Sequence, residues 1–188
     1  MANLIRCKAC GYVTKEGKIK DICPACGVEA KMFEPYTDPV SEKRRIILGL
    51  HIHPIIVHFP QAFAITLFLL AVLSYFAPTA IREMLFNSIQ VISFLLPFFV
   101  ALSIITGLFD GKIRFRKVTT PFLKRKIILG VLFLIISIAL TFVAFLGQLT
   151  APAPPIREYF ILLTVIAVAC GAGLGLLGGH LMEAKFPG

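Results

Sequence analysis

The chain has 188 residues, of which 57% are apolar and 15% are charged, whereas an ordinary soluble domain is about 45–50% apolar and about 25% charged. Its 19 Lys and Arg against 10 Asp and Glu give a formal net charge of +9. This composition excludes a large soluble enzyme core. We expect the excess positive charge to lie in the cytoplasmic loops of a membrane protein, and we expect no nucleic-acid partner.

Composition divides the chain into two parts. Residues 1–38 contain four of the five Cys, whereas Leu, Ile, Phe, Val and Ala dominate from Ile46 onward. We therefore predict a small cysteine domain at 1–38, a linker at 39–53 and a membrane domain at 54–188. The first residues, MANLIRCKAC, contain no apolar stretch of the length that a signal peptide needs, so we expect the cysteine domain to stay in the cytoplasm.

Four Cys in the first part form two Cys-x-x-Cys-Gly motifs, CKACG at 7–11 and CPACG at 23–27. Four thiolates suit one tetrahedral metal ion, and a Gly after each second Cys lets the backbone turn with positive φ. So short a segment with few apolar side chains cannot supply a sufficient core, so we expect it to be disordered without metal. The spacing alone fits iron and zinc equally.

The run RCKACGYVTKEGKIKDICPACGVEAKMFEPY resembles the short rubredoxin domain at the end of rubrerythrins, with its CxxCGY and CPxCG motifs and a closing Phe-Glu-Pro. In that family four Cys hold a single redox-active iron that carries one electron. The resemblance therefore implies iron, with Cys7, Cys10, Cys23 and Cys26 as its ligands. A zinc ribbon that only supports a small domain is the alternative.

Four long apolar runs follow, at about residues 55–76, 84–109, 127–149 and 159–182. Each is near or above the roughly 20 residues that a helix needs to cross a bilayer. The predicted fold is therefore a small metal-bound rubredoxin-like β domain followed by an all-α bundle of four transmembrane helices. We read Asp110-Gly111 as the stop of the second helix.

Basic residues predict the orientation of this bundle. They gather before the first run and between the second and third, whereas the other two connections hold one Arg each, Arg82 and Arg157. The positive-inside rule then places both termini and the central loop in the cytoplasm, with the protein in the inner membrane. The basic residues on that side are Lys43, Arg44, Arg45, Lys112, Arg114, Arg116, Lys117, Lys124, Arg125 and Lys126.

All four His lie near one predicted membrane face. His51, His53 and His58 stand at the entrance of the first helix, and His180 stands at the exit of the last. Titratable side chains within a membrane are expensive and usually face a partner or a cofactor, although some serve only as interfacial anchors. We predict that His58 and His180 ligate a haem b, with His53 as a replacement or a neighbouring group.

Glycines in the last helix bear on the same question. Gly171, Gly175 and Gly179 repeat every four residues and therefore share one face. They permit either close helix packing or the approach of a flat macrocycle. Cys170 is interpreted as a small buried apolar residue.

A second resemblance covers the membrane part. The segments HPIIVHFP at 53–60, TGLFD at 106–110 and GGHL at 178–181 resemble a family of small bacterial four-helix membrane proteins without an assigned function. The resemblance implies the fold and the topology. Haem binding is our own inference from the His pattern.

These observations predict a membrane-bound electron-transfer protein that passes electrons between a rubredoxin-type iron and a His-ligated haem b on the cytoplasmic side. A quinone is the candidate mobile partner, and the cytoplasmic electron donor or acceptor is not identified. One alternative is a non-catalytic membrane protein whose zinc ribbon is an interaction or sensor module. Another is a non-haem metal site formed by His53, His58, His180 and a carboxylate from Asp110 or Glu183. No catalytic residue is assigned; if the protein completes a reaction, it is an oxidoreductase.

Overall fold

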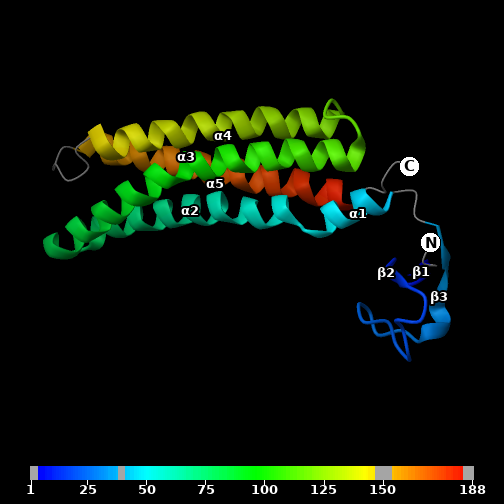
Figure 1. The fold of residues 1–188 in the computed structure, drawn as a ribbon. Coiled ribbons are helices and arrows are strands. Elements are labelled where there is room, and N and C mark those ends of the chain that lie inside the picture. Colours follow the sequence, from blue (N-terminus) through cyan, green and yellow to red (C-terminus); the bar gives the residue numbers. More distant parts are fainter. Residues whose placement is uncertain (1–3, 38–40, 147–153, 184–188) are drawn as a thin grey trace. The chain divides into compact units, whose positions relative to one another are not determined.

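The structure is a computed structural model that describes residues 4–37, 41–146 and 154–183. The chain forms two compact units whose boundary lies between Arg45 and Ile46, within the predicted linker. The first unit is a small sheet domain and the second is a bundle of long helices (Figure 1).

The first unit is built on a three-stranded antiparallel sheet with the order β2-β1-β3. Strand β1 (Leu4–Cys7) lies in the centre, β2 (Val13–Lys15) pairs with one edge and β3 (Phe33–Tyr36) with the other. A 3-10 turn, η1 (Ala30–Met32), leads directly into β3. The central strand therefore ends at a cysteine, Cys7, which pairs with Phe33 of β3.

This first unit has almost no apolar core. Among its described residues only Cys7 and Cys23 are buried, each with 1% of its surface exposed. On the sheet, Arg6 pairs with Glu34 at 2.7 Å and lies over the ring of Tyr36. These contacts are partly exposed and contribute little free energy, so the interior of the unit is the cysteine site itself.

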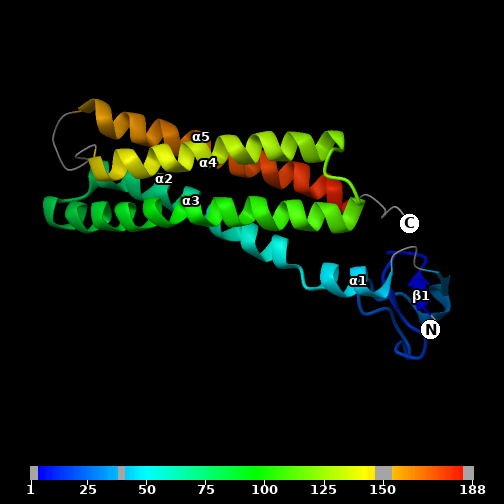
Figure 2. The same ribbon diagram turned by 45° about the horizontal axis from the view of Figure 1, so that its top comes forward.

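The second unit is an antiparallel bundle of four long helices (Figures 1 and 2). They are α2 (Ile52–Phe76), α3 (Thr79–Phe115), α4 (Pro121–Leu146) and α5 (Pro154–Glu183). Helices α2 and α4 each pack against both α3 and α5. All four are long and apolar enough to cross a membrane, which confirms the predicted four-helix architecture and indicates a membrane protein.

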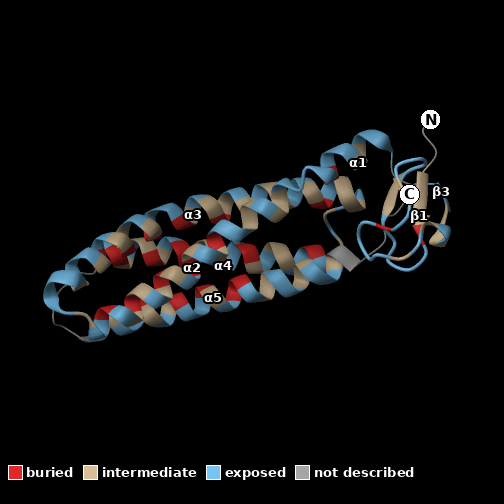
Figure 3. Cartoon of the chain, turned by 90° about the horizontal axis from the view of Figure 1, so that it is seen from below, coloured by how far each residue is buried: buried red, intermediate tan, exposed pale blue. Residues whose placement is uncertain are grey.

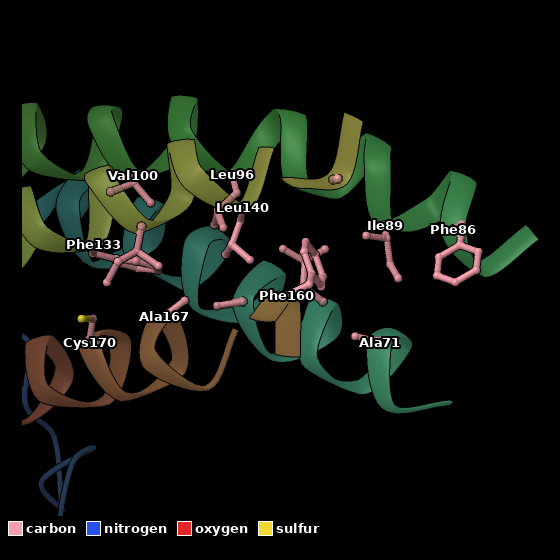
Figure 4. Close-up of a cluster of buried hydrophobic side chains, with 14 residues drawn as sticks. Ala71, Phe86, Ile89, Leu96, Val100, Phe133, Leu140, Phe160, Ala167 and Cys170 are labelled. Atoms are coloured by element: carbon pink, nitrogen blue, oxygen red, sulfur yellow. The ribbon is translucent and has the colours of Figure 1, made fainter. Parts of the chain in front are cut away.

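The bundle buries one apolar cluster and leaves other apolar side chains outside. Side chains from α2, α3, α4 and α5, including Val100, Phe133, Phe160 and Cys170, point into the space between the helices (Figure 4). Figure 3 shows the buried positions along the inner faces. On the outer faces large apolar residues such as Leu176 and Ile128 are about 70% and 69% exposed, as expected for helices that contact lipid.

Small polar residues lie within this core. Ser74, Ser93, Ser137 and Thr164 are completely buried. The hydroxyl of Ser74 donates to the carbonyl of Ala71 at 2.6 Å, and those of Ser137 and Thr164 also donate to carbonyls of their own helices. Small residues at such positions let neighbouring helices approach closely.

The helices extend beyond the apolar runs that predicted them. The expected stop at Asp110-Gly111 is wrong, because α3 continues to Phe115, and Asp110 pairs with Arg114 one turn later at 3.2 Å. An apolar run marks only the part of a helix that faces lipid, whereas the helical backbone can continue into the interface, where charged groups are tolerated. The helix ends where Arg116 adopts a φ of +59°.

Helix α4 also begins earlier than its apolar run. It starts at Pro121, where proline suits the first helical turn, and the Thr120 hydroxyl accepts the N–H of Leu123 at 3.4 Å. The predicted end of this run, 147–149, lies outside the described residues.

The predicted linker contains a helix of its own. Residues Glu42–Gly49 form α1, and the chain then turns at His51, whose φ is +50°. Helix α2 begins at Ile52, before the apolar run predicted from about residue 55, so His53 lies in its first turn.

Candidate metal centre and membrane cavity

The four cysteines of the first unit come together as one group. Cys7 ends β1, and Cys10, Cys23 and Cys26 follow in the two turns beside the sheet. All four sulfurs lie within 4.8 Å of one another. The separation between Sγ atoms is 3.8 Å for Cys7 and Cys26 and also 3.8 Å for Cys10 and Cys23.

The two Cys-x-x-Cys-Gly turns have matching backbone hydrogen bonds. The N–H of Gly11 donates to the carbonyl of Cys7 at 2.9 Å, and the N–H of Gly27 donates to that of Cys23 at the same distance. Both glycines have a φ of +76°, which only Gly adopts without strain. Because the two turns repeat one geometry, they present two pairs of sulfurs to a shared centre.

The sulfur separations fit a tetrahedral metal ion. A metal–sulfur distance of about 2.3 Å corresponds to a tetrahedron with edges of about 3.8 Å. Two of the six sulfur separations equal that edge, and all six lie within 4.8 Å. Iron and zinc both accept four thiolates in this arrangement, so the donor set fits either ion.

The proximity of the thiols also favours a bound cation. Burial raises the pKa of Cys23, but hydrogen bonds from the backbone of Ala25 and Cys26 and from neighbouring thiols lower it to about 7. The backbone of Val28 lowers the pKa of Cys26, but the Cys10 thiol, burial and the other thiols raise it to about 12. Cys23 and Cys26 therefore resist ionising together unless a cation balances their charge.

The second unit contains a cavity of about 380 Å³. It lies at the end of the bundle where α2 and α4 begin and α3 and α5 end, and all four helices contribute to its wall. Most of the wall is apolar. Its titratable or amide side chains are those of His53, His58, Gln61, Asp110, Arg114 and Lys126.

His53 is fixed in this wall by two contacts with α3. Its Nδ1 lies 3.3 Å from Oγ1 of Thr106. Its ring also lies against Gly107, where an added Cβ would stand only 2.8 Å from Cε1. This contact explains why a glycine follows Thr106. The distance along the chain between HPIIVHFP at 53–60 and TGLFD at 106–110 does not reveal that the two segments touch.

The charged groups of the cavity are unequally paired. Asp110 and Arg114 form an ion pair at 3.2 Å, and both side chains are largely buried. Lys126 is half-buried and lines the same wall. Within the described part of the chain, no carboxylate lies within ion-pair distance of its ammonium group.

The glycines of α5 face polar side chains. A Cβ at Gly171 or Gly175 would lie 3.5 or 3.6 Å from atoms of Gln61, and one at Gly178 would lie 3.7 Å from Nζ of Lys126. The Gln61 amide donates to the carbonyl of Gly171 at 3.2 Å. The absence of side chains at these glycines thus leaves room for Gln61 and Lys126, which line the cavity.

The structure does not bring the predicted haem ligands into one cavity. His58 lines the cavity, and its Nδ1–H donates to the carbonyl of Pro54. His180 does not belong to the cavity wall; its ring stacks on Phe122 with centroids 6.1 Å apart, and its Nδ1–H donates to the carbonyl of Leu176 at 2.8 Å. His53, which was predicted as the replacement, is the His that contacts α3.

The histidines that the structure describes likewise do not assemble a non-haem metal site with a described carboxylate. Among the side chains that the structure describes, only the four cysteines bring three or more metal-binding atoms together. The side chain of Glu183 lies outside the described residues. Cys170, which was interpreted as apolar, is 4% exposed within the core of the bundle.

Comparison with known proteins supports the assignment of the first unit. Residues 6–34, which include all four cysteines, match the family model described as the rubredoxin-like domain of rubrerythrin. No curated protein and no solved structure matches the chain. The first unit is therefore a rubredoxin-like domain of the rubrerythrin type with a four-cysteine metal site, as the resemblance implied, and long apolar helices follow it.

Proposed function

We propose that this protein is a membrane-bound electron carrier in which Cys7, Cys10, Cys23 and Cys26 hold one iron ion. The observation that carries the proposal is a cluster of four thiols within 4.8 Å of one another, of the rubrerythrin rubredoxin-like type, in a chain with its own membrane bundle. When bound, iron supplies a one-electron couple between its ferric and ferrous states.

The burial of the ligands supports exchange of electrons with a partner. Cys7 and Cys23 are buried, whereas Cys10 and Cys26 are exposed. Two sulfurs are therefore covered by the domain, and two lie at its surface. A partner molecule can approach the exposed pair without unfolding the site.

We further propose that the rubredoxin-like domain faces the cytoplasm from the inner membrane. The basic residues that support this orientation flank the connection between α3 and α4 and the start of α1. In contrast, beside the connection between α2 and α3 the first turn of α3 carries a single Arg, Arg82, which donates to the carbonyls of Ser74 and Ala77. The asymmetry follows the positive-inside rule.

Nothing in the described part of the chain supports the predicted haem b beyond the free ring nitrogens of two histidines. His58 and His180 each donate Nδ1–H to a carbonyl one turn back, which leaves Nε2 free, as in most metal-ligating histidines. The pair does not share the cavity, however, so the residues present do not fit a haem held between them. Haem ligation by this pair therefore stays a prediction from the sequence.

The second candidate function is a structural zinc ribbon that serves as an interaction or sensor module. The observation that favours it is the sulfur geometry, which suits zinc as well as iron. This function needs no redox change at the cysteines. The identity of the metal therefore separates the two functions.

Metal analysis of matched cysteine variants tests the proposed site. Cys23→Ser removes a buried ligand, whereas Cys170→Ala removes the buried thiol of the helical bundle. We expect about one iron per chain in the unmodified protein and in Cys170→Ala, and a loss of most of that iron in Cys23→Ser. Equal iron content in all three proteins would contradict the four-cysteine site, and zinc in place of iron would favour the ribbon.

A further inference from the structure

We propose that the cavity of the helical bundle binds a hydroquinone, a flat ring with two hydroxyl groups and an apolar tail. The inference rests on the proposed function, because an electron carrier in a membrane needs a redox partner that dissolves there. It goes further by locating the ligand and by assigning His53 and Lys126 as the groups that hold its two oxygens.

The dimensions and chemistry of the cavity suit such a ligand. Its volume of about 380 Å³ lies within the range of about 300–1,000 Å³ that is typical of small-molecule sites. Its wall combines aliphatic side chains from four helices with the ring of Phe133 and a small number of polar groups. A ligand with an apolar body and few oxygens would match this wall.

The hydrogen bonds of Thr106 fix the tautomer of His53. The Thr106 hydroxyl donates to the carbonyl of Leu102 at 2.9 Å, with the carbonyl of Ser103 at 3.2 Å as a second acceptor. The hydroxyl hydrogen of Thr106 is therefore already used. Toward His53 the Thr106 oxygen can only accept a hydrogen bond from the Nδ1–H group. In the neutral ring Nε2 then carries a lone pair, so it accepts a hydrogen bond from a ligand O–H.

Lys126 supplies the complementary donor. Asp110 is already paired with Arg114 at 3.2 Å, and the described residues give the Lys126 ammonium no ion pair of its own. It can therefore donate to the second oxygen of a ligand in the cavity. One acceptor and one cationic donor thus belong to the same apolar wall.

This combination distinguishes a hydroquinone from an anionic lipid. A phosphate or carboxylate would satisfy Lys126 but would present only acceptor oxygens to the acceptor Nε2 of His53. Each hydroxyl of a hydroquinone carries both a hydrogen and lone pairs. It can donate to His53 through one oxygen and accept from Lys126 through the other, which leaves neither of these two side chains unpaired.

Binding of 2-methyl-1,4-naphthohydroquinone to the full-length, zinc-loaded protein tests the proposal. Zinc is used because it has no redox chemistry, so binding is measured without electron transfer. Equilibrium dialysis under argon should give saturable binding of about one molecule per chain. His53→Ala and Lys126→Met should each weaken the affinity about tenfold or more, since each removes one hydrogen bond in an apolar site.

The controls are the exposed neighbours His51→Ala and Lys124→Met, which lie outside the cavity wall. They should bind the probe within about twofold of the unmodified protein. Retained zinc and an unchanged helical circular dichroism signal establish that each variant is folded. If a folded His53→Ala protein binds the probe as tightly as the control, the proposal is overturned.

Oleate, an anionic lipid whose carboxylate only accepts hydrogen bonds, provides the competing probe. Displacement of the hydroquinone only by a large excess of this lipid supports the proposal, whereas lipid binding without hydroquinone binding identifies an anionic-lipid site and overturns it. The proposed iron function fails separately, through the metal content of the purified protein. Hydroquinone binding by a chain that natively holds zinc would therefore retain the cavity assignment and reject the electron carrier.

Discussion

The turn glycines of the metal site act through backbone conformation. Gly27 has a φ of +76° and nothing within 4 Å of an added Cβ, so substitution meets no steric neighbour. A side chain there is nevertheless strained, because L-residues disfavour positive φ. A substitution at Gly27 should therefore weaken metal binding by straining the turn that holds the cysteines.

Gly27→Ala should shorten the lifetime of the bound metal. A strain of about 1–2 kcal/mol in the metal-bound turn corresponds to a roughly fivefold to thirtyfold change in an equilibrium. The rate of metal transfer to a chelator measures this lifetime in the variant and in the unmodified protein. Gly49→Ala is the matched control, since Gly49 also has open space but an ordinary φ; equal rates for the two variants would refute the explanation.

At the scale of single residues, the sequence predicted the metal ligands better than the histidine contacts. The cysteines are close together along the chain and share a repeated local turn, so spacing was sufficient to identify them. The contact of His53 with Thr106 and Gly107 joins two helices. It depends on how α2 and α3 pack, which no local pattern reports.

At the scale of elements, the sheet and the helices depend on different interactions. The sheet domain buries only Cys7 and Cys23 among its described residues. The helices complete their backbone hydrogen bonds within each segment and pack around a separate apolar cluster. The sheet domain should therefore need metal to stay folded, whereas the helical bundle should not.

Removal of the metal should unfold the strands and leave the bundle intact. Amide hydrogen exchange before and after chelation measures both parts in one experiment. We expect exchange in β1 and β3 to become fast, while exchange in the cores of α2 to α5 stays slow. Strands that remain protected without metal would show that the sheet has another source of stability.

Helix boundaries were predicted less well than helix number. Four apolar runs were sufficient to count the helices, because each must cover the thickness of a bilayer. The helix ends lie among charged residues. There, capping by Thr120 and the ion pair of Asp110 with Arg114 determine at which residue a helix begins or ends. Hydropathy contains no information about such contacts.

At the scale of the whole molecule, orientation determines which compartment the metal site meets. The positive-inside pattern predicts that the connection between α3 and α4 faces the cytoplasm. The connection between α4 and α5 should then face the other side. The two are the natural positions for accessibility probes.

Labelling of introduced cysteines in intact cells should reveal this difference. With Cys170→Ala as background, Ala151→Cys should react with a membrane-impermeant maleimide in intact cells, whereas Lys117→Cys should react only after lysis. The native four-cysteine site should likewise react only after lysis and metal removal. The opposite pattern for the two introduced cysteines would reverse the proposed topology.

The combination of a four-thiol site and a membrane bundle in one chain predicts a redox-active iron, and optical spectroscopy of the purified full-length protein tests this claim most directly. Iron and zinc are quantified in the sample whose absorption is recorded after oxidation in air and after reduction with dithionite. We predict iron, with thiolate-to-iron charge-transfer bands that bleach on reduction and return in air. Zinc with no visible absorption would contradict the account.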